Sequence, residues 1–437
     1  MFYRNIIQEN SNWARYIYLV VLGFILIFNQ SWAQLSIEGS GADERPYVLG
    51  LPKINGDNPT QSGTLQSILI EDFKLSGLIK PINTDKSVDI SKLELPQWAA
   101  DGAEFLVLGS ITNDNSDGKG EFGKEINLRI VDVLRNLEMQ GIKVSYDSRQ
   151  TAIVAHQIAD AVIKRITGIE VGLSQLIAFV VHNANGYQIK VSDILGKNSH
   201  AIVHSRNPIT SPTWSPNGNK IAYSSFEDGP ASIFIQDVAS GKRFKIPTDF
   251  DSATAPAWSP DGKSIAFSAY NEGRTGIYEY NLATNKISSL ITDGKINTEP
   301  SYSGDGYLYY SSSRGRSPQI YRVNLSSKQS ERISFEENYC TRPSSATSRP
   351  VVAYLANKGQ KATILDNSLD TQISVSLPAI ADGLAISPQG RLILFSVANN
   401  RNFNIIISNI NGSYVKLVEI NEYNFYEPSW RPSASLN

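Results

Sequence analysis

A repeated unit with a period in the low forties constrains this 437-residue chain more than any other feature. The clearest copies are "SPTWSPNGNKIAYSS" (211–225), "APAWSPDGKSIAFSA" (255–269) and "EPSYSGDGYLYYSSS" (299–313). One position marks every copy of the unit, and it holds Trp214, Trp258, Tyr302, Ser345, Ile386 and Trp430. Short alternating strands repeated at this period are typical of the blades of a β-propeller.

Each repeat divides into four strands. In the best copy, within residues 256–291, they are "PAWS", "SIAFSAY", "GIYEYNL" and "KISSLI". Apolar and polar residues alternate in the second and third of these, as half-buried strands require. Ser-Pro-Asp-Gly supplies the first turn, because Pro fixes its φ and Gly accepts a positive φ at little cost.

Counting the markers predicts six blades and a closed ring. Residues 176–203 match a repeat from its second strand onward but have no inner strand before them. Trp430, conversely, ends an inner strand with no further strand after it. We therefore expect the C-terminal strand to complete the first blade, which removes a free sheet edge. The last ten residues are accordingly expected to be structural.

The chain before the repeats has a different pattern, and we expect a mixed α/β domain over residues 34–170 followed by the propeller over residues 171–437. Helical periodicity runs through residues 62–82 and 149–168, the second ending at Gly168. Strand-like runs lie between them, and the loop Asn113–Gly123 has the composition of a hairpin connection; the runs are residues 104–112, 125–134 and 138–147.

The N-terminus has the features of a secretory signal over residues 1–33. Two arginines precede an apolar run, Tyr16–Phe28, and small residues follow it. Cleavage is expected between Ala33 and Gln34. A retained membrane anchor is the alternative, but the run is shorter than the roughly 20 residues that span a bilayer. Export would favour disulfides, yet the chain has a single cysteine, Cys340, which we interpret as a packing residue.

The sequence offers no catalytic constellation. It has no Gly-x-Ser-x-Gly elbow, Walker loop or dinucleotide fingerprint. Ser259 and Asp261 belong to a turn without a neighbouring histidine. His200 and His204 are four apart in a strand-like segment, where ordinary strand residues are favoured over a metal site. We expect no enzymatic activity, no cofactor and no metal.

The charge of the chain gives no reason to expect nucleic-acid binding. The formal net charge is −2, and no basic stripe stands out. His156 lies in the second predicted helix and is interpreted as a polar-face or satisfied residue. We therefore expect no nucleic-acid partner.

Several motifs along the chain resemble successive signatures of one family. They are "LSIEGSGADERPYVLGLP", "IEDFKLSGLIKPI", "QWAADGAEFLVLGSI" and "RQTAIVAHQIADAVIKRITGIEVG" before the repeats, and "IKVSDILGKNSHAIVHSRNPITSPTWSPNG" and "ITDGKINTEPSYSGDG" within them. In this order they resemble the TolB family of the bacterial Tol–Pal system. The propeller repeats alone are shared by many families, so the N-terminal motifs make the resemblance specific.

The resemblance implies an N-terminal α/β domain followed by a six-bladed propeller. It also implies a monomeric, non-catalytic periplasmic adaptor that supports outer-membrane integrity and constriction at division. Its propeller would bind the peptidoglycan-associated lipoprotein, Pal, and its mature N-terminal segment would bind TolA.

Topology and the resemblance together select one propeller face. The loops entering each inner strand and the loops joining the two middle strands share a face, and the Ser-Pro-Asp-Gly turns lie on the other. The resemblance implies Pal binding on the first face, through Thr298 and Glu299, with Ser252, Thr254 and Arg342 as lesser contacts. Arg274 and Arg314 lie in middle-strand loops of the same face.

Two positions depart from the family pattern. Many members carry a histidine where this chain has Ser252, and an acidic residue is common where it has Arg342. For TolA, the resemblance implies the polar segment Gln34–Glu44, with contacts at Leu35, Ser36, Ile37 and Glu38. The alternative is an accessory propeller of a secreted peptidase or of a glycan-binding enzyme.

Overall fold

The computed structural model describes residues 45–56, 58–89, 93–113, 122–335, 337–422 and 424–432. The expected signal peptide, its cleavage site at Ala33 and Gln34, and the segment Gln34–Glu44 lie outside the described residues. So do residues 114–121 of the expected hairpin loop and residues 433–437 at the C-terminus.

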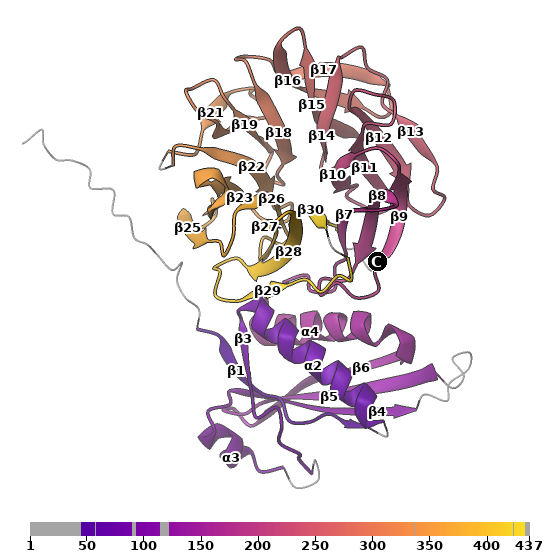
Figure 1. The fold of residues 1–437 in the computed structure, drawn as a ribbon. Helices are drawn as coiled ribbons and strands as arrows, with labels where there is room; N and C mark the ends of the chain where they lie inside the picture. The colour runs from indigo at the N-terminus through magenta and orange to yellow at the C-terminus, as the bar shows by residue number, and fades with distance from the viewer. Residues whose placement is uncertain are drawn as a thin grey trace, which may run out of the picture. The chain divides into compact units, whose positions relative to one another are not determined.

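An α/β region precedes the propeller (Figure 1). Its sheet has the order β3-β1-β4-β5-β6, and β2 also pairs with β4. The pairs of β1 with β3 and with β4 are parallel, whereas β4, β5 and β6 form an antiparallel meander. The strands are β1 (Tyr47–Gly50), β2 (Asn55–Gly56), β3 (Ile79–Ile82), β4 (Phe105–Asn113), β5 (Gly123–Asp132) and β6 (Leu137–Asp147).

Two long helices, α2 (Pro59–Ser76) and α4 (Thr151–Thr167), pack against each other. Asn58 caps α2, because its Oδ1 accepts hydrogen bonds from the amides of Thr60 and Gln61 at 3.0 and 3.3 Å. Helical periodicity extends to residue 82, but the helix ends earlier: Gly77 is left-handed, with φ 70°, and residues 79–82 form β3 instead. Gly168 ends α4 in the same way, with φ 76°, as the sequence predicts.

The other helical elements in the described part of the chain are short: α3 (Leu95–Ala100), η3 (Ser148–Gln150) and η4 (Asn357–Gly359). Among the described residues, no helix combines the length and apolar character needed to cross a membrane.

Six four-stranded antiparallel sheets form the propeller, which confirms the predicted fold. Blade 1 joins β30 (Phe425–Trp430) to β7 (Ile177–Asn183), β8 (Gly186–Ser192) and β9 (His200–Ser205). Blades 2 to 4 follow in chain order, with strands β10 (Ile209–Trp214), β11 (Lys220–Ser225), β12 (Ser232–Asp237), β13 (Arg243–Lys245), β14 (Ser252–Trp258), β15 (Ser264–Asn271), β16 (Arg274–Asn281), β17 (Lys286–Ile291), β18 (Asn297–Tyr302), β19 (Tyr307–Ser312), β20 (Gln319–Asn324) and β21 (Ser330–Arg332).

Blades 5 and 6 complete the ring. Their strands are β22 (Cys340–Ser345), β23 (Val351–Ala356), β24 (Lys361–Asp366), β25 (Thr371–Ser376), β26 (Ala381–Ile386), β27 (Leu392–Asn399), β28 (Asn402–Asn409) and β29 (Val415–Leu417). In all six blades the inner strand ends on the marker residue predicted from the repeat.

The ring closes as the count of repeats predicts. The C-terminal strand β30 pairs with β7, with Phe425 opposite Val181 and Trp430 opposite Ile177. This pairing completes the first blade with the last strand that the structure describes.

A buried aromatic residue at one repeat position forms the core of each blade. It lies on the second strand, and the six side chains are all at most 3% exposed: Phe179, Tyr223, Phe267, Tyr310, Tyr354 and Phe395. These rings pack between neighbouring sheets, where each large aromatic removes 150–250 Å² from water by the usual estimate, about 4–6 kcal/mol of transfer free energy.

Candidate functional site

The six inner strands line a central channel with a cavity of about 380 Å³. Its lining repeats from blade to blade, because each inner strand contributes the residues between its bulge and its marker. The two ends of the channel differ in chemistry: one carries the aromatic markers and the other carries charged side chains.

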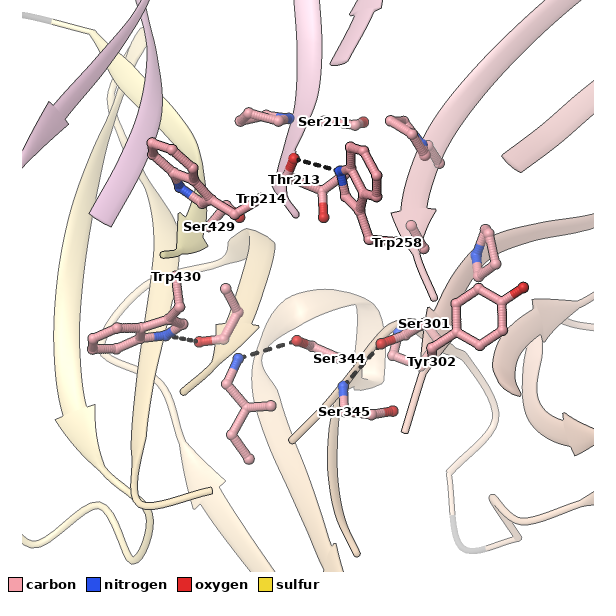
Figure 2. Close-up of a pocket in the computed structure, with 18 of the residues that line it drawn as sticks. Ser211, Thr213, Trp214, Trp258, Ser301, Tyr302, Ser344, Ser345, Ser429 and Trp430 are labelled. Atoms are coloured by element: carbon pink, nitrogen blue, oxygen red, sulfur yellow. Dashed lines mark hydrogen bonds between the residues drawn. The ribbon is translucent and has the colours of Figure 1, made fainter. Parts of the chain in front are cut away.

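The marker end is held by hydrogen bonds between neighbouring blades (Figure 2). Trp258 Nε1 donates to the carbonyl of Thr213 at 3.3 Å, and Trp430 Nε1 donates to the carbonyl of Ala385 at 2.9 Å. At the markers Ser345 and Ile386 a serine hydroxyl of the preceding blade accepts from the marker amide: Ser301 Oγ at 3.0 Å and Ser344 Oγ at 3.1 Å. These tryptophans and serines therefore connect blades.

The Ser-Pro-Asp-Gly turns beside the marker end are structural as well. Ser259 Oγ donates to Asp261 Oδ1 at 2.7 Å and accepts from the amide of Ser264 at 2.9 Å. The amide of Gly262 donates to the carbonyl of Ser259 at 2.9 Å. Both polar groups of the serine are thus used inside the turn, as the sequence predicts for a scaffold residue.

The opposite end of each inner strand carries a β-bulge, which aims one side chain at the channel mouth. In five blades the residue before the proline at the bulge is left-handed without being glycine, with φ between 50° and 57°: Ser211, Ala255, Glu299, Arg342 and Glu427. Blade 6 has Gly383 at this place. A left-handed conformation costs a non-glycine residue roughly 1–2 kcal/mol, so the surrounding contacts must hold it.

An acceptor on the preceding blade holds each of four left-handed amides. Ser224 Oγ accepts from Ala255 at 3.2 Å, and Ser268 Oγ accepts from Glu299 at 3.1 Å. Carboxylates replace the serine in two blades.

The first carboxylate is that of Glu299, whose Oε2 accepts from the amide of Arg342 at 2.8 Å. The second is that of Glu427, whose Oε2 accepts from the amide of Ser211. In blade 1 the serine position of the second strand holds Val180, whereas in blade 4 it holds Ser311, whose hydroxyl donates to Glu299.

Arg342 is the centre of a charged cluster at the mouth. Its Nε lies 3.1 Å from Glu299 Oε1, its Nη2 3.5 Å from Asp382 Oδ1, and its Nη1 3.8 Å from Glu427 Oε1. Burial raises the pKa of Glu427, and the Arg342 charge opposes that rise. One guanidinium faces three carboxylates in this cluster.

The sequence-predicted binding residues fall into two groups. The side chains of Thr298 and Glu299 form hydrogen bonds within the propeller. Thr298 Oγ1 lies 3.1 Å from Ser268 Oγ, and Glu299 Oε2 also accepts from Ser311 Oγ at 2.7 Å. Ser252 and Thr254 are half-buried on β14, the inner strand of blade 3. Only the cluster around Arg342 brings predicted residues from two blades into contact.

The two arginines of the middle-strand loops differ. Arg274 is exposed at the start of β16. Arg314 is folded onto its own blade, where its Nη1 pairs with Asp293 at 2.8 Å and its guanidinium lies 4.4 Å from the centre of the Tyr321 ring. Arg314 is therefore less available to a partner than the sequence suggested.

Sequence reasoning missed an apolar rim on this face. Four large apolar side chains lie exposed in its loops or at a strand end beside them: Tyr270 (45%), Ile296 (48%), Phe335 (71%) and Ile380 (55%). A signal was available only for Ile296, which is the lone apolar residue in the connection 292–296; Phe335 and Ile380 share their connections with other apolar residues. We call these four residues the apolar rim.

The cysteine and the two histidines considered in the sequence lie in ordinary structural positions. Cys340 is buried, and burial raises the pKa of its thiol to about 11. His200 and His204 lie on β9. Within the part of the chain that the structure describes, no group of three or more His, Cys, Asp or Glu side chains is arranged to hold a metal ion.

Of the two alternatives for His156, a polar-face or a satisfied residue, the structure shows the second, through one ring nitrogen. It is buried and bonded to Asp72. The periodicity of α4 did not reveal this, because the partner lies on another helix.

Comparison with known proteins agrees with this architecture. The family model for the TolB beta propeller domain matches residues 163–434, and the model for the TolB amino-terminal domain matches residues 33–139. The crystal structure of TolB from Acinetobacter baumannii superposes with a TM-score of 0.78 at 26% identity, over 90% of this chain and 98% of that one.

Curated relatives give the same family over a shorter span. The Tol-Pal system protein TolB of Bordetella avium is 32% identical over 232 residues, 52% of this chain and 51% of that protein. The protein of the same name from Chromobacterium violaceum is 29% identical over 228 residues, 51% of this chain and 52% of that protein. The chain thus spans about half the length of the curated relatives it matches. Since the propeller family model covers more than half of the chain, the chain belongs to the TolB family.

Proposed function

We propose that this chain is a non-catalytic component of the Tol–Pal system in the periplasm. The observation that carries the proposal is the family match across both regions, together with relatives that are named Tol-Pal system proteins. The proposed role is that of an adaptor that supports outer-membrane integrity and constriction at division. The exported location follows from the predicted signal over residues 1–33.

The proposed Pal surface is the propeller face that carries the channel mouth and the apolar rim. The rim supplies exposed apolar side chains around a polar, charged centre, and exposed apolar groups of this kind mark protein interaction sites. Thr298, Glu299 and Arg342 form the floor of this surface, with Ser252, Thr254 and Arg274 beside it.

A substitution of Glu299 would not test this surface cleanly. Its carboxylate holds the left-handed amide of Arg342 and the hydroxyl of Ser311, so its loss would alter both the fold and the surface. The rim residue Ile296 is a better probe, because its side chain is 48% exposed and the bonds around it use its backbone.

The experiment measures binding of the purified mature chain to the purified periplasmic domain of a Pal lipoprotein by calorimetry. We expect Ile296→Ser and Phe335→Ser each to weaken binding by about tenfold or more, the range of a buried interface anchor. Leu369→Ser is the matched control: Leu369 is 65% exposed in the turn between β24 and β25, on the opposite face. Equal affinities for all variants, or loss of binding only in the control, would reject this face.

The proposed TolA contact is the segment Gln34–Glu44, with Leu35, Ser36, Ile37 and Glu38 as its contacts. A chain beginning at Arg45 should lose capture of TolA while it keeps Pal binding. Retained TolA capture would move the contact to another part of the molecule. Catalysis is not part of the proposal, and the serine of the repeated turn is committed to bonds within that turn.

A further inference from the structure

A buried histidine–aspartate pair in the α/β region takes no part in the proposed binding surface. His156 on α4 and Asp72 on α2 have side chains 2% and 0% exposed, and Nδ1 lies 2.7 Å from Oδ2. The other polar atoms of the pair, Asp72 Oδ1 and His156 Nε2, have no hydrogen-bond partner. A buried charge without a partner is costly, so the state of the proton between these two groups matters to the fold.

Two further carboxylates act on His156. Asp160 lies one turn along α4, and its oxygens accept from the amides of Gly172, Leu173 and Ser174 at 2.9–3.0 Å and from Ser174 Oγ at 2.7 Å. Asp193 is buried after β8 and accepts from the amides of Leu195 and Lys197 at 3.0 and 2.8 Å. Asp160 therefore fastens to α4 the connector, residues 168–176, that leads from this helix to the first propeller strand.

The charged groups around the His156 imidazole belong to three parts of the chain. Asp72 belongs to α2, Asp160 to α4 itself, and Asp193 to the loop after β8, where Lys197 acts on it in turn. Glu71, next to Asp72 on α2, instead accepts from Tyr414 Oη at 2.7 Å and from Lys416 Nζ at 2.8 Å. The strand β6, which also packs on α4, presents Met139, Ile142 and Val144 to the core.

The titration of this cluster has a definite sign. Burial lowers the pKa of His156, but the charge and hydrogen bond of Asp72, with help from Asp193 and Asp160, raise it above its usual value. Burial raises the pKa of Asp72 to about 6 against the opposing charge of His156. Both groups hold protons more tightly in the folded state. Their contribution to stability is therefore greatest at low pH. The part that comes from Asp72 is lost as the pH rises to about 6, and the part that comes from His156 is lost as the pH rises through the folded pKa of the imidazole.

We propose that Asp72, His156, Asp160 and Asp193 form a proton-operated latch on the connector. With a proton on the imidazole, one cation is bonded to Asp72 and attracts Asp160 and Asp193, and it steadies the Asp160 carboxylate that fixes the connector to α4. When the proton leaves, three carboxylates remain near a neutral ring, and the connector loosens from the helix. The latch would make the attachment between the two regions of the chain respond to the pH of the compartment, independently of which partner the propeller binds.

The test is amide hydrogen exchange of the connector in the full mature chain at pH 6 and at pH 8.5, corrected for intrinsic exchange. We expect the protection of Gly172, Leu173 and Ser174 to fall by about tenfold or more between these pH values, since one pKa unit corresponds to a tenfold change. His156→Gln should lower this protection at pH 6 and remove most of its pH dependence. His204→Gln, an exposed histidine on β9, is the matched control and should behave as the unmodified chain.

An unchanged pH dependence in His156→Gln would overturn the proposal, and so would connector protection that is equal at both pH values in the unmodified chain. If His156→Gln fails to fold, Asp72→Asn gives a second test, since its amide oxygen still accepts a hydrogen bond without charge. An NMR titration should then show the His156 imidazole losing its proton at least one pH unit lower than in the unmodified chain. An unshifted titration would equally reject the latch.

Discussion

Two serines at one repeat position have different surroundings. Ser268 and Ser396 lie on the second strands of blades 3 and 6, and each is 1% exposed. Ser268 Oγ accepts from the left-handed amide of Glu299, whereas Ser396 Oγ has no hydrogen-bond partner. At this repeat position, Ser268 therefore connects two blades, whereas the hydroxyl of Ser396 is a buried polar group without a hydrogen bond, which lowers stability.

This contrast gives a prediction at the scale of single atoms. Ser268→Ala should lower the free energy of unfolding by about 1–3 kcal/mol, because it leaves the Glu299 amide without its acceptor. Ser396→Ala should change it by less than about 0.5 kcal/mol or raise it slightly, because no bond is lost. Urea unfolding of both variants measures this, and equal losses would show that the serine bond does not hold the bulge.

Glu427 supports a second residue-scale prediction. Glu427→Ala removes the acceptor of the Ser211 amide and one partner of Arg342, and should cost about 1–3 kcal/mol. Glu170→Ala is the control: its carboxylate is 62% exposed and pairs only with exposed Lys164, so its loss should cost less than about 1 kcal/mol. A similar small loss for both variants would contradict the role of Glu427 as a blade connector.

At the scale of elements, the closing strand β30 is the clearest case. Phe425 on this strand is 3% exposed and packs edge-on against Phe179 of β7, with ring centroids 6.1 Å apart. Phe425→Ala should therefore destabilise the propeller by about 3–5 kcal/mol through the lost burial and the cavity.

The control for this element is Val415→Ala. Val415 is 44% exposed on the outer strand β29, so its truncation should cost less than about 0.5 kcal/mol in thermal or urea unfolding. A small effect of Phe425→Ala would mean that β30 contributes little to closing the ring.

The sequence predicted the helices and strands more accurately than the contacts between side chains. The marker residues predicted the end of every inner strand, and the alternation in residues 264–270 and 276–282 placed β15 and β16 to within two residues. The extent of α2 was less accurate, because apolar residues continue past Gly77 in a pattern that a strand shares over so few positions. Local pattern predicts elements well when a repeat supplies several copies of the same signal.

The candidate site was harder to predict than the elements that carry it. The loops containing Glu299 and Arg342 could be assigned to one face by counting strands. The sequence could not predict that both residues are used in bonds within the propeller, because those bonds join residues of different blades, 43 positions apart. The same holds for His156, whose partner Asp72 lies 84 residues away on another helix.

At the scale of the whole molecule, the contact between α2 and blade 6 offers a test. Gly77 ends α2 in a left-handed conformation, and a Cβ there would lie 2.7 Å from Asn409 Nδ2 at the end of β28. Gly102 is also left-handed, but a Cβ there would meet nothing within 4 Å.

Gly77→Ala should therefore cost more than Gly102→Ala. The strain of a left-handed alanine is common to both, about 1–2 kcal/mol, and Gly77→Ala must in addition displace Asn409 from its 2.8 Å bond to Ser413. Thermal unfolding of the two variants measures the difference. Equal losses would mean that α2 and blade 6 adjust to each other freely.

The pairing of β30 with β7 also determines when the propeller can close during biosynthesis. Blade 1 starts at residue 177 but lacks its inner strand until residues 425–430 have left the ribosome. During that interval β7 presents an unpaired edge, and the five other blades can form without closing the circle. A nascent chain of this design stays an open array of blades until residues 425–430 are available, and any chaperone that protects it has one predictable edge to cover, that of β7.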